Sequence, residues 1–139
     1  MRFVIDTNIL IAALIKDSST REVIFNSGWT FYYPFVAMEE IAKYKFLILQ
    51  KSRLEEADYE ILIRKLFGKI MLIEQSRINS FLDFAYDLIG KIDKKDVPFM
   101  ALALSIPNDG LWTDDSDFEK QNEIKIWKTE DILRIFSDN

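Results

Sequence analysis

The chain contains neither cysteine nor histidine. The lack of cysteine excludes disulfides, thiolate metal sites and cysteine nucleophiles, and it is typical of a cytoplasmic protein. The lack of histidine excludes Ser-His-Asp triads, imidazole ligands to zinc and histidine general bases. Any chemistry must therefore use carboxylates, lysine, tyrosine, hydroxyl groups or a bound metal ion. A site built from carboxylates alone favours hard cations such as Mg²⁺ or Mn²⁺.

Long apolar runs and flexible linkers are also missing. The longest uninterrupted apolar stretch, from Ile9 to Ile15, has seven residues and is far too short to span a bilayer. Only four glycines and three prolines occur in 139 residues, and no repeat or change of composition marks a second domain. We therefore expect a single globular domain over residues 1–139, with no membrane segment.

Apolar runs of strand length alternate with segments of helical spacing along the chain. The expected strands are residues 3–5, 30–33, 70–73, 111–113 and 124–127, and the expected helices are residues 7–15, 19–28, 36–48, 54–68, 76–89, 98–106 and 129–136. Capping boxes that begin at Ser19 and Ser52 mark two of the helix starts. The alternation predicts a three-layer α/β/α sandwich with a central parallel sheet of four to five strands.

Acidic residues follow two of these strands. Asp6 comes directly after the first strand, and Asp114, Asp115 and Asp117 follow the strand at 111–113. In open α/β sheets, ligands bind beyond the carboxyl ends of the strands. Asp6 also suits the cap of the next helix, and three acids in four positions also suit a solvated turn.

Two further acids lie at or near helix starts. Asp96 precedes Val97 and Pro98, where a helix begins, so it suits both an N-cap and a catalytic carboxylate. Glu40 lies at the border of a buried helix face, whereas Glu39 points elsewhere.

Carboxylates that share a hard dication can orient a water molecule, lower its pKa and stabilise charge on a phosphoryl group. The chain has no Walker loop and no Gly-x-Gly-x-x-Gly after its first strand, so other phosphate chemistries lack their motifs. We therefore predict hydrolysis of a phosphodiester.

The charge distribution bears on this prediction in two ways. The formal net charge of −5 disfavours a nucleic-acid substrate, because contacts to phosphate need cations. Between Lys43 and Lys69, however, seven basic residues stand against four acidic ones. Such a segment suits either a solvated helical face or a basic rim beside the acids, with Lys43 and Lys45 as candidate substrate contacts.

Four sequence elements, spread over nearly the whole chain, resemble those of the PIN domain family. They are Val4-Ile5-Asp6-Thr7-Asn8, Met38-Glu39-Glu40-Ile41, Asp96 followed by Ala101 and Ala103, and Thr113-x-Asp115-x-Asp117-Phe118. The family consists of compact α/β nucleases and includes VapC-type toxins and RNA-processing factors. The resemblance implies an endoribonuclease that depends on Mg²⁺ or Mn²⁺.

The resemblance also implies roles for individual residues. Asp6, Glu40, Asp96 and Asp115 form the catalytic quartet, Asp6, Asp96, Asp115 and Asp117 are the candidate metal ligands, and Asn8 and Thr113 support the carboxylates through hydrogen bonds. Glu40 is preferred to Glu39 because an apolar residue follows it, and Asp115 is preferred to Asp114 because of its spacing from Thr113.

Proteins of this family and length are often toxins, so a small antitoxin and a homodimer are the expected partners besides RNA. The main alternative is a non-catalytic PIN-like module that binds RNA or protein. A phosphatase of the aspartyl-phosphate type ranks last, because Asp6-Thr7-Asn8 departs from the Asp-x-Asp that this chemistry uses.

Overall fold

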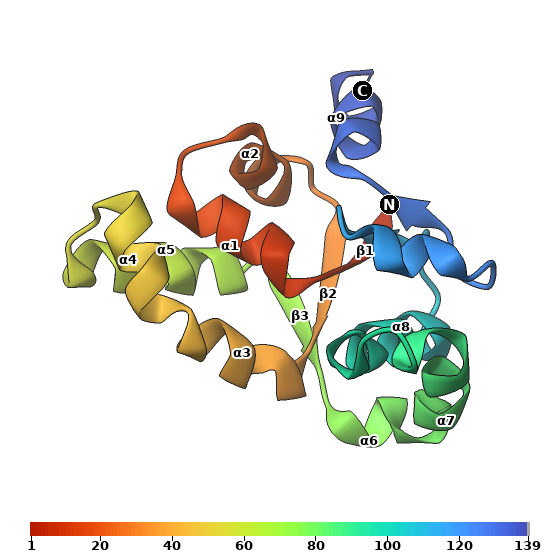
Figure 1. The fold of residues 1–139 in the computed structure, drawn as a ribbon. Coiled ribbons are helices and arrows are strands. Elements are labelled where there is room, and N and C mark those ends of the chain that lie inside the picture. Colours follow the sequence, from red (N-terminus) through yellow and green to blue (C-terminus); the bar gives the residue numbers. More distant parts are fainter. Residues whose placement is uncertain (139) are drawn as a thin grey trace.

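A five-stranded parallel sheet in the order β3-β2-β1-β4-β5 forms the middle layer of the protein, as the computed structural model of residues 1–138 shows (Figure 1). The strands are β1 (Arg2–Ile5), β2 (Thr30–Pro34), β3 (Ile70–Ile73), β4 (Leu111–Trp112) and β5 (Ile126–Trp127). Val4 pairs with Tyr32 on one side and with Leu111 on the other. All five strands run in the same direction, so their carboxyl ends meet at one edge.

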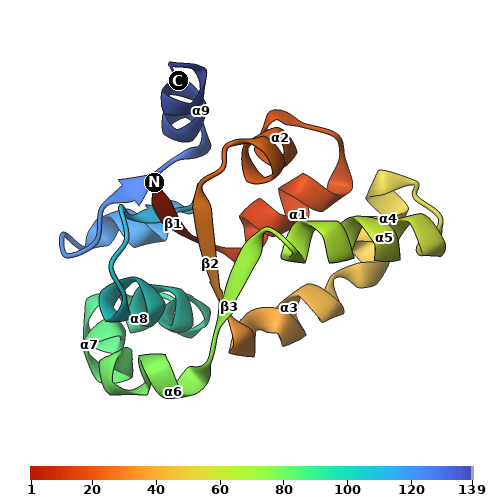
Figure 2. The ribbon, with the colours of Figure 1, turned by 180° about the vertical axis from the view of Figure 1, so that it is seen from behind.

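Helices cover both faces of this sheet (Figures 1 and 2). The α-helices are α1 (Thr7–Ile15), α2 (Ser19–Asn26), α3 (Met38–Lys43), α4 (Lys45–Ser52), α5 (Glu56–Phe67), α6 (Gln75–Ile78), α7 (Leu82–Ala85), α8 (Val97–Ser105) and α9 (Thr129–Ser137). Further helical turns are η1 (Phe35–Ala37), η2 (Asn79–Phe81), η3 (Tyr86–Gly90), η4 (Lys94–Asp96) and η5 (Ser116–Lys120). The three-layer α/β/α sandwich expected from the sequence is thus confirmed. No helix within residues 1–138 has the length and apolar character needed to cross a membrane.

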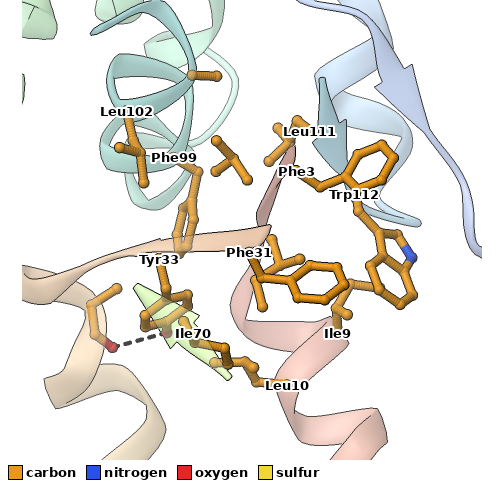
Figure 3. Close-up of a cluster of buried hydrophobic side chains, with 14 of the residues drawn as sticks. Phe3, Ile9, Leu10, Phe31, Tyr33, Ile70, Phe99, Leu102, Leu111 and Trp112 are labelled. Atoms are coloured by element: carbon orange, nitrogen blue, oxygen red, sulfur yellow. Dashed lines mark hydrogen bonds between the residues drawn. The ribbon is translucent and has the colours of Figure 1, made fainter. Parts of the chain in front are cut away.

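The core lies between the two helical layers (Figure 3). Phe99 and Leu102 of α8 approach the sheet from one face, and Ile9 and Leu10 of α1 approach it from the other. Phe3, Phe31, Tyr33 and Trp112 lie in the sheet between them and are fully buried. Burial of each such side chain contributes about 1.5–3 kcal/mol. The continuous apolar strands are those of a parallel sheet covered on both faces.

Several predicted helix boundaries are wrong. Ser18 rather than Ser19 caps α2, since its Oγ accepts a hydrogen bond from the Arg21 N–H at 3.5 Å. The second capping box does not form, because Ser52 is the last residue of α4 and Arg53 adopts a left-handed conformation with φ 60°. The Ser52 hydroxyl donates to the Leu49 carbonyl and accepts from the Leu54 N–H, so it closes α4 instead of opening α5.

Two predicted helices are interrupted and one strand is shorter. The helix expected at 36–48 breaks at Tyr44, whose φ of −90° and ψ of 0° separate α3 from α4. The helix expected at 76–89 divides into α6, η2, α7 and the π-helical turn η3. The strand expected at 124–127 begins only at Ile126, because the Gln121 side chain occupies both the N–H and the carbonyl of Ile124.

Gly110 fixes the entry into β4 and thereby the position of the acidic turn that follows the strand. Its φ is +141°, and a Cβ built on it lies 2.4 Å from the Lys125 carbonyl oxygen. Gly28 also has a positive φ, +71°, but a Cβ there meets no atom within 4 Å.

We predict that Gly110→Ala lowers the free energy of unfolding by roughly 3 kcal/mol or more, because backbone strain and a clash with backbone add up. Gly28→Ala is the matched control, with an expected loss of about 1 kcal/mol from strain alone. Urea unfolding monitored by tryptophan fluorescence measures both values. Equal losses in the two variants contradict the prediction.

Candidate metal centre

A cavity of about 200 Å³ opens at the carboxyl edge of the sheet. Its walls combine polar side chains from the ends of β1 and β4, from α3 and from the start of α8. The four predicted catalytic acids, Asp6, Glu40, Asp96 and Asp115, all line it. Residues separated by more than a hundred positions in the sequence therefore meet here because the strands are parallel.

Asp6 ends β1 and caps α1 at the same time. Its Oδ1 accepts a hydrogen bond from the Ile9 N–H at 3.0 Å, as an N-cap does. Its Oδ2 accepts a hydrogen bond from the Thr113 hydroxyl, which comes from the neighbouring strand end. The side chain is thus held at both oxygens and is only 5% exposed. The sequence presents capping of α1 and a place in a ligand site as alternatives for Asp6. In the structure Asp6 caps α1 and also lines the cavity.

Asp96 occupies the N-cap position of α8, but within the described chain its side chain does not cap the helix. Its Oδ2 is buried and has no hydrogen-bond partner among residues 1–138. A buried carboxylate oxygen without a partner costs free energy, so it calls for a proton or a cation at this place. The structure therefore gives Asp96 no role in holding the helix start.

The turn after β4 directs its acids to different places. The Thr113 hydroxyl accepts a hydrogen bond from the Asp115 N–H at 3.0 Å, and Asp115 Oδ1 accepts one from the Asp117 N–H at 2.9 Å. Asp114 instead accepts hydrogen bonds from the N–H and the hydroxyl of Thr129, at 2.7 and 2.6 Å, at the start of α9. Asp114 thus serves the last helix, and Asp115 lines the cavity.

Asp96, Asp115 and Asp117 form a compact acidic triad, with one carboxylate oxygen of each within 4.8 Å of the other two. Oxygen ligands of this type suit Mg²⁺ or Mn²⁺. Asp6, the fourth predicted ligand, lies in the same cavity but is not part of the triad, and both of its oxygens already accept hydrogen bonds.

Electrostatics make this cluster unfavourable in the absence of a cation. Burial raises the pKa of Asp6 to about 6, with smaller contributions from the charges of Asp114 and Asp115. Burial and, to a smaller extent, the neighbouring carboxylates, Asp115 first, together raise the pKa of Asp96 to about 7. Both shifts reflect the burial of negative charge close to other carboxylates. A divalent cation is the partner that this donor set fits.

The remaining predicted residues lie at different distances from the cavity. Glu40 lines the cavity. Glu39 is exposed and does not line the cavity, but it lines a second groove beside it, which Glu40 and Tyr44 also line. Thr113 is buried and bonds to Asp6, whereas Asn8 is an exposed residue of the cavity wall.

The two predicted substrate lysines also differ. Lys43 lines the adjoining groove. The Lys45 ammonium lies 2.7 Å from Glu56 and 3.0 Å from Glu60, on the surface between α4 and α5, and Lys45 does not line the cavity.

Sequence reasoning missed five residues of the cavity: Thr7, Tyr44, Asp93, Lys95 and Phe99. Asp93 and Lys95 shortly precede the predicted Asp96, and the dense charges of residues 93–96 are the signal that could have found them. The Asp93 carboxylate accepts a hydrogen bond from the Lys95 N–H at 2.9 Å, which shapes the turn before Asp96. Tyr44 gives no signal of its own, because it reads as an ordinary half-buried residue of a helix.

The family model of the PIN domain matches residues 4–136. The chain belongs to the PIN domain family. No curated protein matches it closely enough to count as a relative. PIN domains are generally nucleases that use divalent metal ions, and the acidic triad of this PIN domain is consistent with such use.

We predict that the metal-free protein becomes less stable as the pH rises from 5 to 8. In the unfolded chain both carboxyl groups titrate near about 3.9, well below the folded pKa values of Asp6 and Asp96. The unfolded state therefore binds fewer protons between these values, and the free energy of unfolding falls as the pH rises through about 7. No histidine contributes to this interval.

Thermal unfolding in EDTA at pH 5, 6, 7 and 8 measures this dependence. Asp96→Asn removes one of the two groups and should flatten the profile. A wild-type stability that is constant or increases over this range contradicts the raised pKa values.

Proposed function

We propose that this PIN domain is a divalent-metal-dependent endoribonuclease. The observation that carries the proposal is the Asp96 carboxylate: its buried Oδ2 has no hydrogen-bond partner within residues 1–138, and one of its oxygens lies within 4.8 Å of a carboxylate oxygen of Asp115 and of Asp117. An arrangement of this kind is costly for stability and is expected where a cation binds. The family supports nuclease activity, and the choice of RNA as substrate is the finer part of the proposal.

Asp96, Asp115 and Asp117 are the residues proposed to hold Mg²⁺ or Mn²⁺. When bound, such an ion lowers the pKa of a water molecule and stabilises the charge that develops on the phosphoryl oxygens. The protein keeps these ligands in place through a short chain of hydrogen bonds. Thr113 donates to Asp6 and accepts from the Asp115 backbone, and Asp115 in turn accepts from the Asp117 backbone.

Two other residues of the cavity complete the proposed chemistry. Hydrolysis forms a bond between a water oxygen and phosphorus and breaks the bond between phosphorus and the ribose oxygen. The attacking water loses one proton, and the leaving ribose oxygen takes up one proton from solvent. Glu40 lines the cavity from α3 and is proposed to accept the proton of the attacking water at its carboxylate. Lys95 lines the same cavity and forms no ion pair within residues 1–138, so its ammonium is suited to contact a non-bridging phosphate oxygen.

The adjacent acids Asp114 and Asp115 provide the sharpest test. Asp115→Asn should reduce cleavage of a mixed RNA pool more than about a hundredfold, because it removes a proposed ligand rather than a supporting group. Asp114→Asn is the matched control with the same loss of charge. It should keep cleavage within a few-fold of wild type while losing about 1 kcal/mol of stability at the start of α9.

Cleavage is measured with Mg²⁺, with Mn²⁺ and with EDTA, after circular dichroism has shown that each variant is folded. A single-stranded DNA pool of equal length tests the choice of RNA. Equal cleavage by both aspartate variants, or cleavage in EDTA, refutes the proposed mechanism.

A second measurement tests metal binding without any substrate. Mg²⁺ or Mn²⁺ should raise the thermal midpoint of the wild type in proportion to the logarithm of its concentration, since only the folded state holds the three ligands. Asp96→Asn should lose most of this rise, and Asp114→Asn should keep it. Equal shifts in all three proteins assign the metal to another place.

The finer assignment, a toxin with an antitoxin and a homodimeric state, remains a prediction from the resemblance. Exposed apolar side chains on the helical pair of α4 and α5 support a protein partner of some kind: Phe46 is 80% exposed and Ile61 is 51% exposed. Sedimentation of the purified protein tests the dimer, and wild-type toxicity that Asp115→Asn abolishes in cells tests the toxin.

A further inference from the structure

A second groove adjoins the acidic cavity, with a volume of about 400 Å³. Glu40, Tyr44, Lys95 and Phe99 line both of them, so the groove lies directly beside the cavity. A polynucleotide chain whose phosphodiester lies at the acids therefore has a neighbouring nucleotide at this groove. The inference below rests on the proposed nuclease function.

The groove differs from the cavity in its chemistry. The groove is lined by Val36, Pro98, Tyr44 and Phe99 among others, so its surface is mainly apolar. Val36 is 44% exposed, although its apolar side chain would ordinarily be covered. An aromatic ring with aliphatic neighbours is the surface on which an unpaired base stacks.

Two cations lie beside this apolar surface. Lys43 and Lys95 both line the groove, and neither forms an ion pair in the part of the chain that the structure describes. Lys45, only two positions from Lys43, has Glu56 and Glu60 as partners. Lysines that lack acidic partners beside an apolar groove match a ligand that combines an apolar ring with negative charge, as a nucleotide does.

Glu39 provides a basis for selectivity between nucleobases. It is exposed, it lines the groove and it is not part of the acidic cavity. A carboxylate accepts hydrogen bonds but donates none, so it pairs with the exocyclic amino group of cytosine and repels the carbonyl oxygen at the same position of uracil.

We propose that this groove is a subsite for one unpaired nucleobase next to the bond that is cut, with Tyr44 as its stacking residue and Glu39 selecting a base that carries an amino group. Lys43 and Lys95 contact the phosphates on either side of this base. The subsite makes the base, and not only the phosphate backbone, part of what the protein recognises.

The test compares three hexamers of equal length and charge: oligocytidylate, oligouridylate and an abasic ribose-phosphate chain. Binding is measured by fluorescence anisotropy at low salt in EDTA, where the proposed cleavage cannot occur. The wild type should bind oligocytidylate roughly tenfold more tightly than oligouridylate, the discrimination of one good hydrogen-bonded contact. It should bind oligouridylate roughly tenfold more tightly than the abasic chain, as expected for one stacked base.

Matched variants separate the contributions. Glu39→Gln should remove the preference for cytosine, and Glu55→Gln, the same change at an exposed residue before α5, should keep it. Tyr44→Leu keeps an apolar side chain against the core and should remove the advantage over the abasic chain, whereas Tyr44→Phe keeps the ring and the advantage. Lys43→Ala should weaken the binding of all three hexamers equally. It should also lower the salt dependence of binding by about one counterion.

Equal affinity of the wild type for all three hexamers overturns the inference, as does a cytosine preference that Glu39→Gln leaves intact. Failure to bind any hexamer overturns it as well. Metal-dependent cleavage of the RNA pool is measured alongside, so that a nuclease without a base subsite is distinguished from a protein that is not a nuclease.

Discussion

The Thr113 hydroxyl makes the contact on which the acidic site depends. It donates to Asp6 at the end of β1 and accepts from the Asp115 N–H after β4, so it joins two neighbouring strand ends that the sequence separates by more than a hundred residues. A hydroxyl is needed for this role, because it donates and accepts at the same time. The parallel pairing of β1 and β4, with Ile5 opposite Trp112, brings the residues to this distance. The register of the sheet thus determines the geometry of the acids.

The same geometry has a cost in stability. Carboxylates that converge at a buried edge repel one another, and the raised pKa values of Asp6 and Asp96 express this repulsion together with the loss of water. The large core around β1, in which Phe3, Val4 and Ile5 are all fully buried, stabilises the fold and offsets this cost. Asp114, another acid of the turn after β4, instead accepts hydrogen bonds at the N-terminus of α9, where negative charge is favourable.

Much of this arrangement was predictable from the sequence, for physical reasons. Strand order along the chain and the rule that parallel strands end at one edge suffice to bring Asp6 and Asp115 together. The spacing from Thr113 distinguishes Asp115 from Asp114, and the structure indeed places only Asp115 at the cavity wall. Tyr44 was not predictable as a neighbour of the site, because its position depends on where α3 ends. Local sequence preferences fix such boundaries poorly, as the misplaced cap at Ser52 illustrates.

The break of the helix at Tyr44 lies at the groove that is proposed to bind a nucleobase. Glu40 and Lys43 are three residues apart in α3, so they share a helix face. Tyr44, at the break between α3 and α4, lines the same groove as Glu39, Glu40 and Lys43. The sheet therefore positions Asp6 and Asp115, which are proposed to act on a phosphodiester, and α3 with its end at Tyr44 positions side chains of the adjoining groove. Glu39 and Lys43 of α3 line the groove but not the cavity, so a substitution at either one changes the groove without changing the register of the sheet.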